Sequence, residues 1–467
     1  MKRFVFVLCS FIFTQIAFAQ QFTLYNSNTL YDAFENPSER AFQADSSKKY
    51  ATNIFIPTFG VNGFIVGPAQ ESFRSSLFIG VPNAVNLELG THQVNRIVSH
   101  ANVYLAMFRI FKTEKFNTEM GFSWQIRNDG NLLITNETLA LLQSFKLFKS
   151  PPTVNLLNNK GYDQSYHQVS ITYREDYNRR LSLGVKVSVL SGMTYQKLNI
   201  QSSNLIINTP NNTMTASLNG NLRSSSKYNE FDNKALIPNF KNPGLSLSLS
   251  AGYKFKNGIF MLANLKDAGF ILWSKNSYNY AFNKTVLIDS TDTKNPNKEL
   301  HQTFDKMINE SGSNGGFITS TNTKAEVLFN KKLGWYHPNL IFSKSIQNGD
   351  GDIVLVNNVK IGNWVYTATG DYNFYNLFQA GGQVMYKTPN FECFAGSDQL
   401  FKTIETANSY FTKNDAGSGY TGASLYFGFA FKFGPDVEHP HNANTIPGFK
   451  EDRIQKSFFR RLLFWRK

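Results

Sequence analysis

SLYFGFAFKF, residues 424–433, alternates apolar with polar or small side chains without a break. In an extended chain successive side chains point to opposite faces, so one face of this segment carries only leucine and phenylalanine. The other face carries Tyr426, Gly428, Ala430 and Lys432. A strand of this kind suits the boundary between lipid and water, and its position near the C-terminus predicts the closing strand of a β-barrel.

The same period of two recurs along the chain. It is clear in TEMGFSWQIR (residues 118–127), LSLGVKVSVL (residues 181–190) and LSLSLSAGYKF (residues 245–255). Segments of about ten residues have the length that a tilted strand needs to cross a membrane. The first strand is expected in YATNIFIPTFGVNGF, residues 50–64.

The segments between these runs are of two kinds, short turns and long polar connections. Short turns at one rim and long loops at the other are typical of outer-membrane barrels. About fourteen strands are predicted, within a range of about twelve to sixteen, because residues 193–223 fit either two long hairpin arms or one bent strand. Turns are expected near Lys115, near Asp176 and at 210–212, 256–258 and 388–390, and long connections at 67–100, 128–163, 225–241, 273–321 and 400–418.

The composition favours a membrane barrel over a soluble β-sandwich, which is the alternative fold. Aromatic residues make up 15% of the chain, Phe alone numbers 43, and charged residues are only 17%. A soluble sheet buries one face against another sheet. Aromatic side chains on so many strands are explained more simply if they contact lipid. The fold class predicted is therefore all-β, a transmembrane antiparallel barrel with an inward N-terminal plug segment and short loop helices.

The N-terminus reads as a cleaved secretory signal peptide, residues 1–19. Lys2 and Arg3 precede an apolar run of about fifteen residues that ends in Ala17-Phe18-Ala19, too short to span a bilayer of roughly thirty Å. Cleavage removes Cys9 and leaves Cys393 as the only cysteine, so no intramolecular disulfide is expected. The location predicted is the cell outer membrane.

The chain is basic, with a formal net charge of +14. Two of its positive charges, those of Lys2 and Arg3, are lost when the signal peptide is cleaved. Such a surplus fits anionic lipid or lipopolysaccharide phosphate as a neighbour, and export argues against nucleic acid. The basic tail, residues 434–467, ends in KSFFRRLLFWRK, which contains no acidic residue. This end is interpreted as an interfacial helix, a disordered end or a docking peptide for a periplasmic partner, and its proposed membrane-contacting residues are Lys456, Arg460, Arg461, Trp465 and Arg466.

A second helical segment is NETLALLQSFKLF, residues 136–148, with Asn136 as its expected cap. Its simplest interpretation is a helix on the rim of a loop, and the alternative is a lid. Cationic side chains also interrupt the alternating runs at inward positions, which predicts a wet, mildly cationic interior or side chains that satisfy one another. These inward residues are Lys186, Lys254, Lys360 and Lys432, with Gln125 and Arg127.

The sequence contains no phosphate-binding loop, zinc motif, nucleophile elbow or dinucleotide fingerprint. His439 and His441 could pass for a metal site, but a proline separates them and a third ligand is missing, so a solvated tail is the better interpretation. No enzymatic activity, cofactor or metal is predicted.

Asn36-Pro37-Ser38, ahead of the first strand, resembles the Asn-Pro-Ala element of long-chain fatty-acid transporter-type barrels and of barrels associated with type IX secretion. NLKDAGFILW, residues 264–273, together with most of the mature chain, looks like an uncharacterised family of Bacteroidetes outer-membrane proteins. The resemblance implies that residues 20–49 fold inward as a hatch and that residues 50–433 form the barrel. Ser38 replaces the usual alanine, and the resemblance transfers no ligand-contact residue.

The leading hypothesis is passive uptake of a hydrophobic or amphipathic small molecule through a plugged barrel. The first alternative is a barrel that carries or anchors secreted or surface proteins, with a secretion-system component as partner. A structural or adhesive barrel and an outer-membrane hydrolase are the remaining alternatives.

Overall fold

The computed structural model describes residues 22–43, 46–80, 83–113, 117–143, 147–148, 153–208, 211, 213–228, 230, 233–289, 296–415, 417–437 and 457–459. The predicted signal peptide, residues 1–19, lies outside the described residues, and so do the histidines and basic residues predicted for the tail: His439, His441, Lys456, Arg460, Arg461, Trp465 and Arg466. The predictions made for these residues remain predictions.

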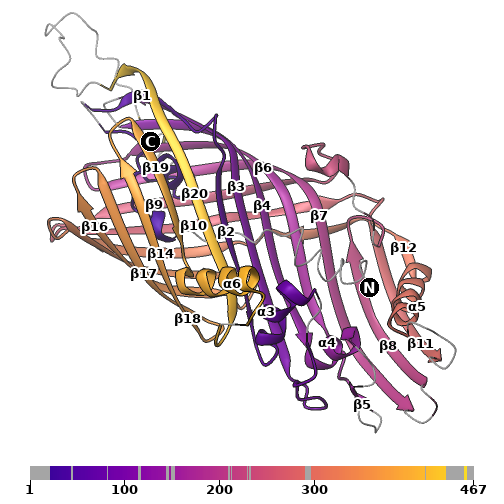
Figure 1. Ribbon diagram of the computed structural model, residues 1–467. Coiled ribbons are helices and arrows are strands. Elements are labelled where there is room, and N and C mark those ends of the chain that lie inside the picture. The colour runs from indigo at the N-terminus through magenta and orange to yellow at the C-terminus, as the bar shows by residue number, and fades with distance from the viewer. Residues whose placement is uncertain are drawn as a thin grey trace, which may run out of the picture.

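The chain forms a closed antiparallel barrel of 14 wall strands, as the period-two pattern predicts (Figure 1). The last strand, β20 (Thr421–Asp436), closes the barrel by pairing with both β1 (Lys48–Thr52) and β2 (Thr58–Val66). β1 and β2 share one position in the wall, and both also pair with β3 (Val94–Thr113).

The other wall strands follow one another in chain order, each antiparallel to its neighbours. β13 (Phe317–Ser320) pairs with the end of β10 and continues the wall position of β14. The remaining wall strands are β4 (Thr118–Thr135), β6 (Lys160–Asp176), β7 (Leu181–Asn208), β9 (Pro243–Lys254), β10 (Ile259–Trp273), β14 (Lys324–Lys331), β15 (Tyr336–Ser345), β16 (Gly351–Ile361), β17 (Trp364–Asn373), β18 (Leu377–Lys387) and β19 (Phe391–Ser397).

The outer face of the wall is apolar. On β20, Leu425 and Phe433 are exposed, whereas Tyr426 and Ala430 on the opposite face are buried. Exposed leucine, valine, isoleucine and phenylalanine continue around β6, β7, β9, β10, β15 and β16. This is the surface that a barrel presents to lipid. Among the described residues, no helix is long and apolar enough to cross a membrane.

The strands extend further toward the long-loop rim than predicted. β3 begins at Val94 and β4 ends at Thr135, so residues 94–100 and 128–135 of the predicted connections 67–100 and 128–163 are strand. The alternation fades there because both faces contact protein. Asp129 accepts from His100 inside, and Ile134 packs outside against the helices α3 (Gln70–Ile79) and α4 (Asn136–Gln143).

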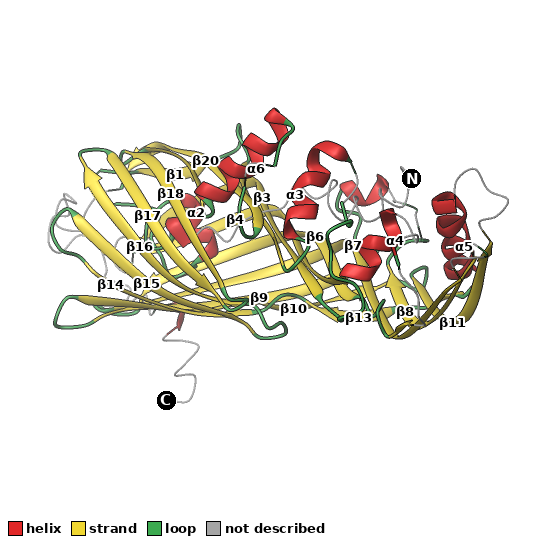
Figure 2. Cartoon of the chain, turned by 60° about the horizontal axis from the view of Figure 1, so that its bottom comes forward, coloured by secondary structure: helices red, strands yellow, loops and turns green. Residues whose placement is uncertain are grey.

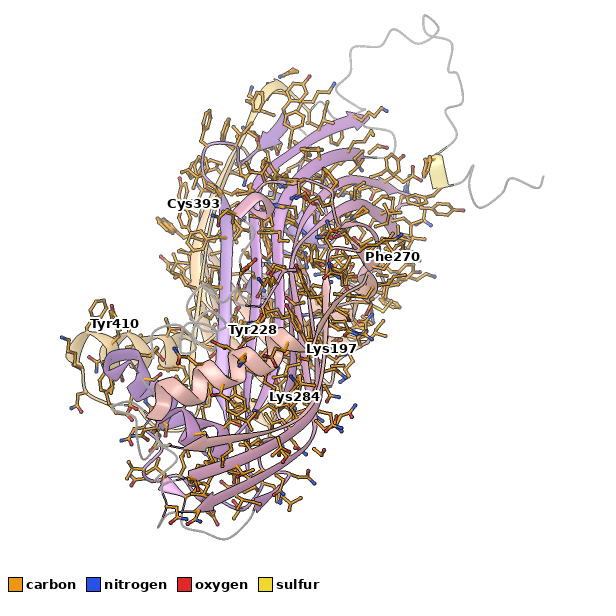
Figure 3. All side chains as sticks on the ribbon, turned by 90° about the vertical axis from the view of Figure 1, so that its right-hand side faces the viewer. Lys197, Tyr228, Phe270, Lys284, Cys393 and Tyr410 are labelled. Carbon is orange, nitrogen blue, oxygen red and sulfur yellow. The ribbon has the colours of Figure 1, made fainter. Side chains whose placement is uncertain are left out.

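The predicted loop helix is present as α4. Its cap is Thr135 and not Asn136, because Thr135 Oγ1 accepts from the backbone N–H of Thr138 at 3.3 Å. A third rim helix, α6 (Leu400–Thr412), projects from the side of the barrel, where Figure 3 labels Tyr410.

β7 continues beyond the barrel as one arm of a hairpin with β8 (Thr213–Ser224), which confirms the hairpin alternative for residues 193–223. β8 pairs with β11 (Tyr278–Asp289), and β11 with β12 (Gly312–Asn314). The helix α5 (Pro296–Glu310) packs beside β11 (Figure 1). The smaller elements are β5 (Thr153–Val154), paired with β7, and the 3-10 turn η3 (Asn233–Leu236).

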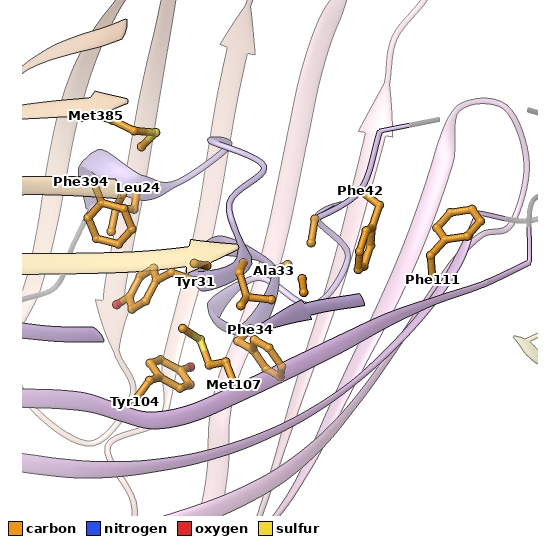
Figure 4. Close-up of a cluster of buried hydrophobic side chains, with 14 of the residues drawn as sticks. Leu24, Tyr31, Ala33, Phe34, Phe42, Tyr104, Met107, Phe111, Met385 and Phe394 are labelled. Atoms are coloured by element: carbon orange, nitrogen blue, oxygen red, sulfur yellow. The ribbon is translucent and has the colours of Figure 1, made fainter. Parts of the chain in front are cut away.

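The N-terminal residues 22–43 lie inside the barrel and are named the plug below. They contain the 3-10 turn η1 (Phe22–Leu24) and the helix α2 (Leu30–Glu35), which Figure 2 shows enclosed by strands. Leu24, Tyr31 and Phe34 pack against buried side chains of β3, β18 and β19 (Figure 4). The barrel core is therefore formed between the plug and the wall.

Candidate functional site

The plug is a short helix held by local capping. Thr29 Oγ1 accepts from the N–H of Asp32 at 3.1 Å, and the Asp32 carboxylate accepts from the N–H groups of Ser27 and Asn28 at 2.8 and 3.0 Å. The helix ends at Glu35, because Asn36 precedes a proline and such a residue is disfavoured in helical conformation. Burial raises the pKa of Asp32 to about 6.

Asn36, Pro37 and Ser38 meet the wall on three adjacent strands. Asn264 Nδ2 of β10 donates to Asn36 Oδ1 at 2.6 Å, and the Ser38 and Ser250 hydroxyls lie 2.6 Å apart. A Cβ added at Gly184 of β7 would lie 2.1 Å from the Pro37 carbonyl carbon. Asn36-Pro37-Ser38 therefore contacts β7, β9 and β10. The hydroxyl of Ser38 bonds to that of Ser250, a contact that an alanine at position 38 could not make.

Glu35, the last residue of α2, enters an ion-pair network that we call the ionic anchor: Glu35, Arg127, Lys186, Lys266, Asp267 and Glu326. Glu35 Oε1 lies 2.6 Å from Arg127 Nη2, and Glu35 Oε2 lies 3.6 Å from Lys266 Nζ. Burial alone would raise the pKa of the Glu35 carboxyl, but Arg127 and Lys266 hold it well below its usual range.

The wall completes the ionic anchor with acids of its own. Arg127 Nη1 lies 2.9 Å from Asp267 Oδ2, Lys186 Nζ lies 3.5 Å from Asp267 Oδ1, and Lys266 Nζ lies 3.0 Å from Glu326 Oε2. The interior is therefore mixed in charge, and the inward cations Lys186 and Arg127 are satisfied by neighbouring carboxylates. Of the two predicted alternatives, side chains that satisfy one another are therefore found for Lys186 and Arg127, and the mildly cationic interior is corrected, because the plug and the wall supply acids.

Polar wall side chains also hold the backbone of the plug. Arg109, paired with Glu119 at 2.7 Å, donates to the carbonyl of Ala33. Lys387 Nζ donates to the carbonyls of Ser27 and Asn28. Such contacts can be replaced by water when the plug moves, so they make a reversible attachment.

The remaining space in the lumen is small. One cavity of about 40 Å³ lies beside the ionic anchor, and a second of about 10 Å³ lies among Asp350, Asp352, Asp371 and Asp398. His100 lines both, with Nδ1 3.0 Å from Asp129 and Nε2 3.3 Å from Asp350. Each of these two cavities has room for little more than water. No group of three His, Cys, Asp or Glu side chains in the described part is arranged to hold a metal ion.

The first wall strand is interrupted at residues 53–57, a region that we call the seam. Thr52 pairs with Phe431 and Phe59 with Phe427, so seven steps along the first strand face four along β20. Three residues are therefore looped out. The prediction of one first strand over 50–64 is wrong, and Pro57, which has no N–H to donate, is the signal that could have shown it. The looped-out residues Ile54, Phe55 and Ile56 are exposed.

Asn53 closes the seam toward β3. Its Oδ1 accepts from the N–H of Met107 at 2.6 Å, its Nδ2 donates to the carbonyl of Tyr104 at 3.2 Å, and its N–H donates to the carbonyl of Met107 at 3.3 Å. One amide side chain thus takes the place of missing strand pairing.

The inner side of the seam is apolar. Tyr104 and Met107 of β3, on one flank, and Tyr426 and Ala430 of β20, on the other, belong to one buried cluster. The plug completes this cluster with Leu24, Tyr31 and Phe34, as Figure 4 shows for the plug and β3 side chains. If the plug moved, an apolar surface would be open between the lumen and the seam.

Sequence reasoning missed the acids of the ionic anchor. Asp267 has φ 49° and lies at a register shift in the pairing of β10 with β9, so both Lys266 and Asp267 are buried. The available signal was a pair of adjacent charges inside an apolar strand. The contact of Glu35 with Arg127 has no local signal, because these residues are far apart in the sequence.

Three solved structures are similar to this chain, and the titles of two of them name a hydrocarbon channel or a toluene transporter. A TodX deltaS2S3 mutant monoaromatic hydrocarbon channel is 7% identical, with 86% of this chain and 94% of that chain covered and a TM-score of 0.43. A Pseudomonas aeruginosa FadL homologue is 10% identical, with 87% and 95% covered and a TM-score of 0.43. The P. putida toluene transporter TodX is 6% identical, with 86% and 94% covered and a TM-score of 0.43.

Two comparisons at the level of sequence complete these findings. No curated protein matches the chain. The sequence model of a family of unknown function matches residues 59–398.

Proposed function

The chain belongs to this family, DUF5723, and we propose that it is an outer-membrane barrel for passive uptake of hydrophobic or amphipathic small molecules. In this proposal residues 1–19 direct export, residues 20–49 form the hatch, and Asn36, Pro37 and Ser38 seat it against the wall. The seam is the exit toward lipid.

The observation that carries the proposal is the seam backed by the apolar cluster. A closed lumen filled by interlocked side chains would by itself suit a structural barrel equally well. A structural barrel, however, gains nothing from a wall strand that loses pairing on both sides and exposes Ile54, Phe55 and Ile56. An apolar molecule can use such a site, because it meets apolar side chains from the lumen through the wall to the lipid.

The described arrangement is the closed state. The plug occupies the inner side of the seam, where it packs in the apolar cluster and is also held by polar contacts through Glu35 and through backbone carbonyls. Passage requires the plug to shift, so that Leu24, Tyr31 and Phe34 leave the cluster. The plug then acts as a reversible stopper.

The test removes the three surplus residues of the seam. Deleting residues 54–56 would leave four steps between Thr52 and Phe59, equal to the count on β20, and so let the first strand run through. Entry of a labelled fatty acid or aromatic hydrocarbon into proteoliposomes should fall to the level of empty vesicles. The matched control replaces Ile54, Phe55 and Ile56 by leucine, which keeps the length and the apolar character of the seam and should retain entry.

Each outcome has a defined meaning. Entry that survives the deletion in a correctly folded barrel would refute the seam as the exit. If neither the unmodified protein nor a variant that lacks residues 20–49 admits any labelled compound, the proposed uptake function is wrong.

A further inference from the structure

The strand β19 is too short to fill its place in the wall up to the long-loop rim. Its last pair with β18 joins Ser397 to Gly382, and its last residue paired with β20 is Gly396. Beyond these pairs, residues 377–381 of β18 and 421–425 of β20 have no β19 residue between them. The chain enters α6 directly after this point, and α6 contacts both β18 and β20.

Hydroxyl groups of α6 bond to the edge of β20 that the short strand leaves open. The N–H of Ser424 donates to Thr403 Oγ1 at 2.9 Å, and Thr406 Oγ1 donates to the carbonyl of Gly422 at 2.9 Å. In water, such backbone groups can bond to solvent, whereas in hydrocarbon they need a partner within the protein. These two bonds therefore suit a strand edge that lies in lipid.

The face of α6 that is turned away from the wall is apolar in its first half. Leu400, Phe401 and Ile404 are 39%, 64% and 58% exposed. The charged side chains of Lys402 and Glu405 pair with each other at 2.7 Å and are only 17% and 31% exposed. A surface helix in water shows its charged side to the solvent, so this half of α6 has the opposite arrangement.

The last turn of α6 is mixed in character. Tyr410 and Phe411 are 55% and 80% exposed, and Asn408 and Thr412 are exposed beside them. Aromatic rings next to polar groups are typical of the interface between acyl chains and headgroups. Figure 3 shows α6 standing out from the wall and labels Tyr410 near this end of the helix.

Aromatic side chains on the outer face of β18 indicate the depth at which α6 begins. Phe378 is exposed toward the long-loop rim, and the Tyr386 ring, toward the short-turn rim, lies 5.0 Å from the ring of the exposed Trp364. Barrels carry such rings at both membrane interfaces. Gly382 lies midway between Phe378 and Tyr386, about 13 Å along the strand from each. A Cβ added at Gly382 would lie 3.4 Å from Leu400 Cδ2, so α6 leaves the wall within the apolar band.

We propose that α6 is embedded in the acyl chains of the leaflet at the long-loop rim, where it completes the wall between β18 and β20. Its first half contacts acyl chains, and its last turn reaches the headgroup region. The partner is lipid because the exposed face of α6 continues the lipid-facing surface of these strands, on which Phe378 and Leu425 are exposed. With 13 residues, α6 is about 20 Å long and enters the membrane without crossing it.

The test attaches a nitroxide spin label to single cysteines in the full mature chain, reconstituted in phospholipid nanodiscs. Cys393→Ser removes the native thiol, and Ile404→Cys and Thr412→Cys place the label on α6. Collisions of the label with oxygen, which concentrates among acyl chains, are compared with collisions with a water-soluble nickel complex. Leu355→Cys, exposed on the outer face of β16, is the lipid-facing control. Lys306→Cys, at a side chain that is 77% exposed on α5, is the matched helix control.

The ratio of oxygen to nickel collisions at Ile404→Cys should match the ratio at Leu355→Cys. It should exceed the ratio at Lys306→Cys about tenfold, because a polar complex partitions poorly into acyl chains. Thr412→Cys should give an intermediate ratio, because the last turn reaches the headgroups.

A ratio at Ile404→Cys equal to that at Lys306→Cys would place α6 in water and overturn the proposal. Few collisions with either reagent, together with an immobilised label, would reveal a protein partner on α6 and overturn lipid as the occupant. Phe401→Cys repeats the measurement one turn earlier in the helix. Migration of the unheated protein on gels verifies that each variant retains a folded barrel.

Discussion

Glu35→Gln tests whether the ionic anchor holds the plug. Removing one partner of a buried ion pair costs about 3–5 kcal/mol. The glutamine oxygen can still accept from Arg127 or Tyr104, which returns roughly 1 to 1.5 kcal/mol. The docked plug should therefore lose about 1.5–4 kcal/mol, so that it leaves the wall roughly 10 to 700 times more often.

Amide hydrogen exchange of a peptide covering residues 27–39 measures this opening directly. The N–H of Asn36 donates to the carbonyl of Asp32 at 2.7 Å and that of Ala33 to the carbonyl of Thr29 at 3.1 Å, so both are protected while the plug is docked. Their exchange should accelerate by the same factor, with no change in peptides from β16 to β18. An acceleration below about threefold would refute the ionic anchor as the main attachment of the plug.

Three further outcomes follow from the same contacts. Burial raises the pKa of Glu39 to about 8, so the docked plug binds a proton more readily than a released plug, and docking should weaken as pH rises from about 5 through 8. Exchange corrected for its intrinsic rate should show this trend. Glu39→Gln should remove the part of the trend above about pH 6 and leave the part below it, to which the raised pKa of Asp32, about 6, contributes. Gly184→Ala should displace Pro37 and accelerate exchange of the plug, whereas Gly315→Ala, which meets no atom within 4 Å, should not. Asn53→Ala removes two side-chain hydrogen bonds at the seam, about 1–3 kcal/mol locally, and should increase entry of labelled hydrocarbon; a decrease would contradict the proposed exit.

The barrel itself could be predicted from sequence because its wall repeats one local rule. In β20, β7 and β9 one face meets lipid and the other meets the interior, and the alternation reports this directly. The rule weakens where both faces touch protein, as at the end of β4, and the strands were therefore predicted too short.

The site was less predictable because its contacts join distant parts of the chain. Asn36 to Ser38 were found by resemblance, but nothing near them indicates that Asn264, Ser250 and Gly184 are their neighbours. The seam had a local signal in Pro57, which was read as part of a continuous strand. A proline within an alternating run is thus a marker of broken pairing in a barrel wall.

The Thr23 hydroxyl donates to the hydroxyl of Tyr426, which comes 403 residues later. The plug can therefore complete its contacts only when β20 is in place. Before the barrel has closed around the plug, Arg127 and Lys266 would lack their ion-pair partner Glu35 from α2. We therefore expect closing of the barrel by β20 and docking of the plug to depend on each other, because each supplies contacts that the other needs.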